Sequence, residues 1–272
     1  MQLGQVGIWR RRTEGHDDLA ELEALGYTAF WVGFSPSLPQ AREFLERSST
    51  LTIATGILNV WQHEPAAVAA EHADLVRDFP DRFLLGIGVG HPEATAEYQA
   101  PLAKMRAFFD GLDAAPQPVA RDQRCAAALG PKMLDLAAER SLGAHTYFVT
   151  PEHTQAARER LGPDALIATE LAVVVETDDD TARAAAREYA ALYLGARNYR
   201  RNLERLGYTT ADIDGGGSDR LIDAVIPHGT PEQISEVVRA HLDAGADHVC
   251  LQPVGHGHAP LGDYRALASA LF

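Results

Sequence analysis

The chain contains Leu51-Thr52-Ile53-Ala54-Thr55-Gly56-Ile57-Leu58-Asn59 and, further along, Phe83-Leu84-Leu85-Gly86-Ile87-Gly88-Val89-Gly90-His91. Each stretch is an apolar, partly β-branched run that ends in small and polar residues. This pattern is typical of a strand buried on both faces whose last residues open onto a site. Glycines there indicate either a close approach to the backbone or a crowded barrel interior. The second run does not match the dinucleotide-binding fingerprint, because neither frame has Gly or Ala at the sixth position.

Strand and helix patterns alternate along the chain, which predicts a parallel sheet with helical crossovers. Eight strands are predicted, over residues 3–9, 29–34, 51–58, 83–89, 124–129, 145–149, 166–175 and 248–254. Helices are predicted near 16–25, 39–48, 65–78, 101–112, 132–141, 152–161, 180–206 and 231–244. Eight such units favour the α/β class and a closed (β/α)8 TIM barrel over an open doubly wound sheet.

One domain accounts for the whole length. At 272 residues the chain fits a single (β/α)8 barrel over residues 1–272. Residues 207–219, which include Gly215-Gly216-Gly217, are predicted to form a flexible loop and a candidate lid. The capping signal Thr230-Pro231-Glu232-Gln233 predicts the start of a late helix.

The charge balance limits the class of partner. The chain has 24 basic and 38 acidic residues and a net charge of -14, so we expect neither nucleic acid nor a membrane as a partner. No apolar run reaches the roughly 18–20 residues that cross a bilayer, and the first residues resemble a strand rather than a signal peptide. Cys125 and Cys250 fall in predicted buried strands, as free thiols do in a reducing compartment. We therefore expect a cytoplasmic protein.

Working residues of a (β/α)8 barrel lie at the carboxyl ends of its strands and in the loops that follow. Among the residues that this rule selects are Trp9, 56–59, 88–91, Glu170 and Gln252. The His, Cys and acidic residues match no metal-site motif, so we expect no metal. We interpret His256-Gly257-His258 as a solvated loop rather than a chelating pair.

The turn Gly130-Pro131-Lys132-Met133 joins a predicted strand to a predicted helix. Backbone N–H groups and the helix dipole at such a turn bind phosphate, and Lys132 would add a positive charge. An ordinary strand-to-helix turn is the alternative interpretation.

Four motifs, in their order along the chain, resemble the luciferase-like monooxygenase superfamily. They are residues 54–59, residues 81–91, Leu129-Gly130-Pro131-Lys132-Met133 and Gly229-Thr230-Pro231-Glu232-Gln233. The chain is most similar to the branch of coenzyme F420-dependent oxidoreductases, and the similarity spans nearly all of it. The resemblance implies a (β/α)8 barrel with an insertion, a homodimer, and a flavin or deazaflavin ring across the carboxyl-terminal mouth.

The resemblance also implies which residues bind the coenzyme. Gly56-Ile57 matches the position of a non-prolyl cis peptide that presses on one face of the ring. Gly88, Val89 and Gly90 would line the edge of the ring, and Asn59 would hydrogen-bond to its polar side. The coenzyme's phosphate would be held by the turn formed by Gly130, Pro131, Lys132 and Met133.

His91 is the predicted catalytic residue, a general acid that falls where a related sugar-phosphate dehydrogenase has a glutamate. It could instead serve only to bind the ring or to cap the turn. The dehydrogenase's Asp-His pair is replaced here by Phe34-Ser35, so the base that accepts a substrate hydroxyl proton is missing and sugar-phosphate oxidation is not expected.

The sequence therefore predicts an oxidoreductase that transfers a hydride between coenzyme F420 and a small organic substrate. One alternative is a luciferase-like monooxygenase that uses flavin mononucleotide (FMN) and oxygen. The other is a barrel that binds F420 or another phosphorylated ligand without turnover.

Overall fold

The computed structural model describes residues 3–91, 99–255 and 261–272, and His256-Gly257-His258 lies outside them. All strands pair in parallel in the order β3-β2-β1-β9-β8-β7-β6-β5-β4, and β3 also pairs with β5, which closes the barrel. The strands are β1 Val6–Arg11, β2 Ala29–Gly33, β3 Thr52–Gly56, β4 Leu58–Asn59, β5 Phe83–Gly88, β6 Arg124–Ala127, β7 Gly143–Thr146, β8 Leu166–Val173 and β9 His248–Pro253. Because β4 continues β3, the two occupy one strand position, and the wall of the barrel has eight such positions, here called staves. The predicted (β/α)8 fold is confirmed.

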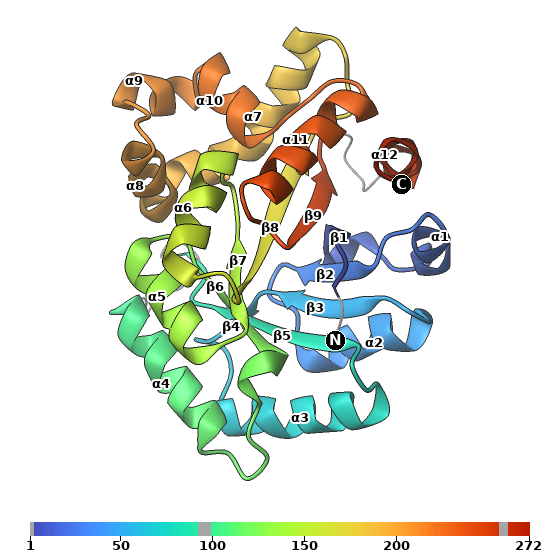
Figure 1. Ribbon diagram of the computed structural model, residues 1–272, viewed down its shortest axis with the longest axis vertical. Helices are drawn as coiled ribbons and strands as arrows, with labels where there is room; N and C mark the ends of the chain where they lie inside the picture. The colour runs from blue at the N-terminus through green and yellow to red at the C-terminus, as the bar shows by residue number, and fades with distance from the viewer. Residues whose placement is uncertain (1–2, 92–98, 256–260) are drawn as a thin grey trace.

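Helices surround the barrel, and a second group of helices forms an insertion (Figure 1). The surrounding helices are α1 Leu19–Ala24, α2 Leu38–Arg47, α3 Pro65–Asp78, α4 Pro101–Asp113, α5 Pro131–Arg140, α6 Pro151–Leu161, α11 Pro231–Asp243 and α12 Leu261–Leu271. The insertion, between β8 and α11, contains α7 Asp179–Gly195, α8 Arg197–Arg205, α9 Thr210–Ile213 and α10 Asp219–Val225. Since it follows the carboxyl end of β8, it lies on the face of the barrel where active sites form.

The barrel interior is separate from the core between strands and helices, because side chains alternate along each strand. Trp9, Trp31, Ala54, Leu84, Cys125, Ala168 and Cys250 belong to the interior cluster, and both cysteines are free and buried. Trp31 and His145 stack with ring centroids 4.2 Å apart and fill the middle of the barrel. The interior is therefore a packed core, and the space for a ligand lies above it.

Proline and side-chain caps determine where several helices begin. The helices α2, α3, α4, α5, α6 and α11 each have Pro in the first turn, where the missing N–H costs nothing. The predicted capping box of α11 is present: the Thr230 side chain accepts from the Gln233 N–H, and the Gln233 side chain accepts from the Thr230 N–H.

The structure differs from the sequence prediction in four elements. The helix predicted over 180–206 is divided into α7 and α8 at Ala196, which follows the poor helix former Gly195 and is extended. The strand predicted over 145–149 ends at Thr146, and Phe148 has a left-handed φ of 55°. Residues 207–219, predicted as a loop, contain α9 and a 3-10 turn, Asp214–Gly216. Helix α12 was not predicted.

No helix in the described ranges has both the length and the apolar character needed to cross a membrane.

Buried histidines are expected to make the fold sensitive to acid. Burial lowers the pKa values of His72, His145, His241 and His248 to about 4 each. Between about pH 6.5 and pH 4 the unfolded chain binds these protons and the folded chain does not. We therefore expect the free energy of unfolding, measured with urea, to fall as the pH is lowered through this range. Each histidine should contribute about 1 kcal/mol per pH unit to this fall. The His72→Leu variant should show a shallower fall, and an equal slope in both proteins would contradict this.

Gly86 tests the packing of the barrel wall. A Cβ atom at Gly86 would lie 2.0 Å from the carbonyl oxygen of Thr55, which is backbone and cannot move aside. Gly86→Ala should lower stability by about 3 kcal/mol or more. Gly195→Ala is the matched control: nothing lies within 4 Å of a Cβ at this helical position, so it should be neutral or stabilising by up to about 1 kcal/mol. Equal urea midpoints for the two variants would contradict the packing argument.

Candidate active site

The peptide bond between Gly56 and Ile57 is cis, as the resemblance implied. It lies in a bulge at the mouth of the barrel, between β3 and β4. Ala54 pairs with Leu84 and Leu58 pairs with Ile87, so four residue steps on this stave face three on β5. The extra residue turns the backbone out of the ladder at this point.

Trp9 explains the glycine at position 56. A Cβ at Gly56 would lie 2.7 Å from the Trp9 Nε1 atom, and one at Gly33 would lie 2.2 Å from the same indole ring. The Trp9 side chain is 5% exposed, and its buried Nε1–H has no hydrogen-bond partner in the described part of the chain. A buried donor without a partner is costly, and this one lies directly against Gly56.

The other glycines of the two runs have different causes. Gly86 is required by the adjacent backbone of Thr55, and a Cβ at Gly88 would lie 2.8 Å from the Ala127 side chain and about 3.0 Å from Ile57. Gly90 has a φ of 60°, in the left-handed region. Crowding within the barrel therefore accounts for Gly86 and Gly88, and backbone conformation accounts for Gly90.

Asn59 and Val89 hold the loop after β4 in place. The Asn59 Oδ1 atom accepts a hydrogen bond from the Trp61 backbone N–H at 3.0 Å, and the Trp61 indole N–H donates to the Val89 carbonyl at 3.0 Å. The Asn59 Nδ2 atom lies 3.2 Å from the Cβ position of Gly90. Because Oδ1 is used in this way, the Nδ2 group of Asn59 is left for the predicted contact with the coenzyme ring.

His91 lies at the rim of the mouth and packs on the insertion. Its ring centroid is 5.4 Å from that of Tyr199 and 6.4 Å from that of Tyr193. Its side chain is partly exposed. The structure thus brings His91 near two tyrosines that lie in the region predicted as a helix over 180–206.

The turn at Gly130 combines a helix N-terminus with a cation. Gly130 is the N-cap of α5 and supplies no side-chain cap. Pro131 has no N–H and the Met133 N–H donates to the Gly130 carbonyl, so the Lys132 N–H is the one that remains available in the first turn of the described helix. A Cβ at Gly130 would lie 3.3 Å from a terminal guanidinium nitrogen of Arg205, which comes from α8. Lys132 is exposed, and no ion pair is recorded for Arg205 or Lys132 among the described residues. This arrangement suits an anion.

The remaining predicted residues of this turn have other contacts. Met133 packs against the core between the barrel and its helices, and the Pro131 carbonyl accepts from Arg160 Nε at 2.9 Å. Sequence reasoning missed Arg205. A signal was present, because α8 carries Arg197, Arg200, Arg201 and Arg205 in a chain of net charge -14.

A polar cluster lies beside Trp9. The hydroxyl oxygens of Tyr147 and Tyr189 lie 2.9 and 2.8 Å from Gln252 Oε1, which accepts a hydrogen bond from one of them. Burial raises the pKa of Glu170, on the neighbouring strand β8, to about 8. The rule for barrel strands had selected Glu170 and Gln252. Tyr147, Tyr189 and Tyr193, which gather here, were not predicted as site residues.

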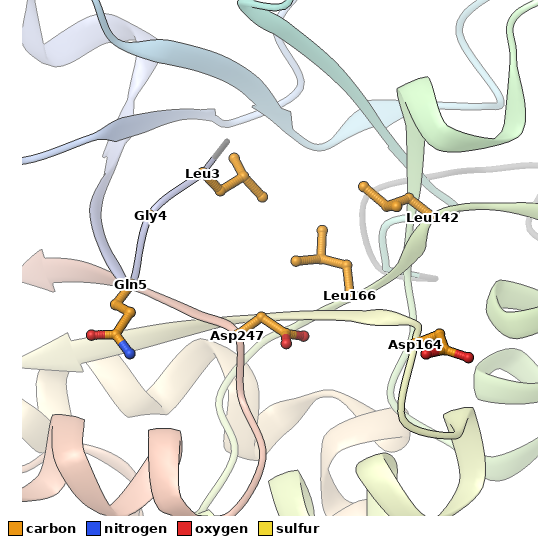
Figure 2. Close-up of a pocket in the computed structure, with 7 residues that line it drawn as sticks. All are labelled: Leu3, Gly4, Gln5, Leu142, Asp164, Leu166 and Asp247. Carbon is orange, nitrogen blue, oxygen red and sulfur yellow. The ribbon is translucent and has the colours of Figure 1, made fainter. Parts of the chain in front are cut away.

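The cavity drawn in Figure 2 lies at the opposite end of the barrel. It has a volume of about 470 Å³ and is lined by Leu3, Gly4, Gln5, Leu142, Asp164, Leu166 and Asp247. These residues begin or precede their strands, and that end of a barrel serves stability rather than catalysis. Asp247 is already engaged, because Arg158 donates to it at 2.6 Å. No group of three or more potential metal ligands occurs in the described ranges.

Solved structures with the same fold include F420-dependent enzymes and an enzyme in complex with FMN. An F420-dependent secondary alcohol dehydrogenase in complex with an F420-acetone adduct is 16% identical, covers 100% of both chains and has a TM-score of 0.77. The coenzyme F420-dependent tetrahydromethanopterin reductase of Methanopyrus kandleri is 18% identical, covers 98% of this chain and 97% of its own, and has a TM-score of 0.72. The oxygenating constituent of 3,6-diketocamphane monooxygenase from Pseudomonas putida, in complex with FMN, is 13% identical and has a TM-score of 0.70. The match covers 97% of this chain and 96% of that one.

At these identities the likeness shows the fold alone, and no curated protein matches the chain. A family model provides the assignment. The model for luciferase-like monooxygenases matches residues 16–110 and 100–248, which is most of the sequence. The chain therefore belongs to the luciferase-like monooxygenase family, whose members are mostly oxidoreductases and monooxygenases.

Proposed function

We propose that the protein is an oxidoreductase that uses coenzyme F420 to transfer a hydride to or from a small organic substrate. The observation that carries the proposal is the anion site at Gly130, where Arg205 and the N-terminus of α5 converge. Such a site suits the phosphate of a flavin or deazaflavin coenzyme. Family membership supports the same coenzyme class.

The residues at the mouth fit a ring of this kind. The unpartnered Trp9 N–H would face the ring beside Gly56-Ile57, and the Asn59 amide would reach its polar side. When bound, the coenzyme would supply the hydride chemistry, and the protein would orient substrate and ring. The homodimer implied by the resemblance and a cytoplasmic location remain predictions.

Helix α8 favours F420 over FMN. Arg197, Arg201 and Arg205 are exposed and spaced four residues apart, so they form a stripe on one face of the helix. Arg205 lies over Gly130, and the other two extend the positive charge beyond the phosphate site. Coenzyme F420 carries carboxylates beyond its phosphate, whereas FMN ends at its phosphate, so only F420 would use the whole stripe.

The end of β2 argues against an alcohol substrate that needs a base there. Phe34 and Ser35, with φ values of 67° and 56°, occupy this position, and neither ionises near neutral pH. Phe34 is 58% exposed and offers an apolar surface. A small apolar carbonyl or enone compound therefore suits the site better than a sugar phosphate.

A binding titration that compares F420 with FMN tests the proposal. We expect F420 to bind more tightly than FMN, and Arg205→Ala to weaken F420 by about tenfold or more, because it removes a charge-assisted contact to the phosphate. Gly130→Glu should weaken binding further, since its carboxylate would pair with Arg205 and repel the phosphate.

Arg239→Ala, on α11, is the control for a general change in charge. Arg201→Ala should weaken F420 and leave FMN unchanged. Tighter binding of FMN than of F420, together with product formation that requires oxygen, would favour the FMN monooxygenase. Tight F420 binding without turnover on any carbonyl compound would favour the non-catalytic barrel.

His91 variants test its role at the rim. As a general acid it would contribute about 10²–10⁴-fold to turnover, so His91→Ala and His91→Gln should lose at least a hundredfold in kcat while F420 affinity is kept. The opposite pattern, weaker F420 binding and unchanged kcat at saturation, would make His91 a binding residue. Both quantities are measured on the same preparation, by titration and by steady-state kinetics.

A further inference from the structure

Glu170 is a buried acid that neither the resemblance nor the proposed binding site uses. It lies in the middle of β8, its side chain is 1% exposed, and it belongs to the interior face of the barrel. Neither carboxyl oxygen makes a hydrogen bond of ordinary geometry within the described residues. Burial raises its pKa, and the Phe148 N–H and the Tyr189 hydroxyl are the donors that partly oppose this effect.

Three tyrosine hydroxyls next to Glu170 form a connected hydrogen-bond network. Tyr147 and Tyr189 oxygens are 2.6 Å apart, and the Tyr193 hydroxyl donates to Tyr147 at 3.0 Å. The Tyr147 and Tyr189 oxygens are also within hydrogen-bond distance of Gln252 Oε1, at 2.9 and 2.8 Å. At a separation of 2.6 Å one hydroxyl must donate to the other, so the two protons cannot both point to Gln252. With Tyr189 as the donor to Tyr147, the Tyr147 proton is left to point to Gln252, and Tyr189 is the tyrosine whose hydroxyl acts on Glu170.

Tyr147 is the member of this network that reaches the mouth. Its ring meets the Trp9 ring edge to face at 5.4 Å, and Trp9 is the side chain that packs against Gly56. Tyr147 and Tyr189 are both only partly buried, in contrast to Glu170. His91 lies further out, on the far side of Tyr193.

We propose that Glu170, Tyr189 and Tyr147 form a proton relay that delivers a proton from the barrel interior to a substrate oxygen at the mouth. Tyr147 gives its hydroxyl proton to the oxygen, Tyr189 gives its proton to Tyr147, and the Glu170 carboxyl gives its proton to Tyr189. Each transfer breaks one O–H bond and forms another, and no electrons are exchanged with the protein. The negative charge comes to rest on Glu170, and water later restores the proton.

The acidities of the groups agree with this order. With its pKa raised by burial to about 8, Glu170 is protonated at neutral pH and remains a stronger acid than tyrosine. Burial raises the pKa of Tyr147, Tyr189, Tyr193 and Cys250, and the charge that Glu170 carries once it is ionised raises each of them further. Arg11 is the cation that acts on Tyr193 from the rim and partly opposes this effect.

Deuterium exchange of the Glu170 carboxyl tests the relay without a substrate. A protonated carboxyl gives an infrared C=O band at neutral pH, which Glu170→Gln should remove, and the band shifts when the proton is replaced by deuterium. After transfer to D2O the wild-type band should shift quickly, because the relay carries protons to the mouth. Tyr147→Phe and Tyr189→Phe should slow the shift by at least tenfold.

Tyr199→Phe is the matched control, because its ring packs on Tyr193 but no hydrogen bond connects its hydroxyl to the network in the described residues. It should exchange like the wild type. A loosened fold would speed exchange, so destabilisation cannot imitate the expected slowing. Equal rates in wild type and Tyr147→Phe, or a missing carboxyl band in the wild type, would overturn the relay.

The part of the inference that concerns substrate rests on the proposed function, and a second measurement separates the two. Saturating F420 should slow the deuterium shift, because the ring would cover Tyr147. An unchanged rate with F420 bound would show that protons leave elsewhere and would overturn the assignment of Tyr147 as the outlet. If neither F420 nor FMN binds, the proposed function fails, and the exchange rates of the free protein still decide whether the relay exists.

Discussion

The packing of the Trp9 indole inside the barrel determines the shape of the mouth. Its ring occupies the volume that side chains at Gly33 and Gly56 would fill, so two neighbouring staves must have glycine there. The cis peptide and the bulge follow immediately after Gly56. On its other side the ring contacts Tyr147, the first of the hydrogen-bonded tyrosines. One buried aromatic side chain thus connects the backbone at the mouth with the polar network, which explains why both lie at the same height in the barrel.

Sequence reasoning predicted the barrel well, because strands buried on both faces and Gly-terminated helices leave a local pattern. The starts of α3 and α11 are marked by Pro65 and by Thr230, which are local signals of the same kind. The differences arise where tertiary contacts override the pattern. Helix α12 lies beyond the last predicted strand, and its Tyr264 and Leu267 are buried only because the barrel is closed beside them.

The candidate site was predicted less completely, for a physical reason. Gly130 and Lys132 are adjacent in sequence and formed a recognisable turn, whereas Arg205 reaches the turn from a helix 75 positions away. The same holds for Tyr189 and Glu170, whose partnership depends on how α7 crosses the mouth. Distance in the sequence conceals such pairs, and burial alone cannot separate a working carboxyl from a structural one. Spacing within a motif predicts local geometry only.

The insertion α7 to α10 forms a hydrophobic cluster that includes Ala186, Leu203, Ile222 and Val225 and is joined to the barrel by Phe148, Ala172 and Val174. This unit carries both the cation at the phosphate turn and two of the three tyrosines of the network. Under the two proposals, coenzyme binding and proton supply both depend on the position of this one segment. A shift of this one body by an ångström would change both at once, while the barrel with its bulge stayed fixed. Remodelling this single segment would change which ligands fit the mouth and leave the closed sheet beneath it unaltered.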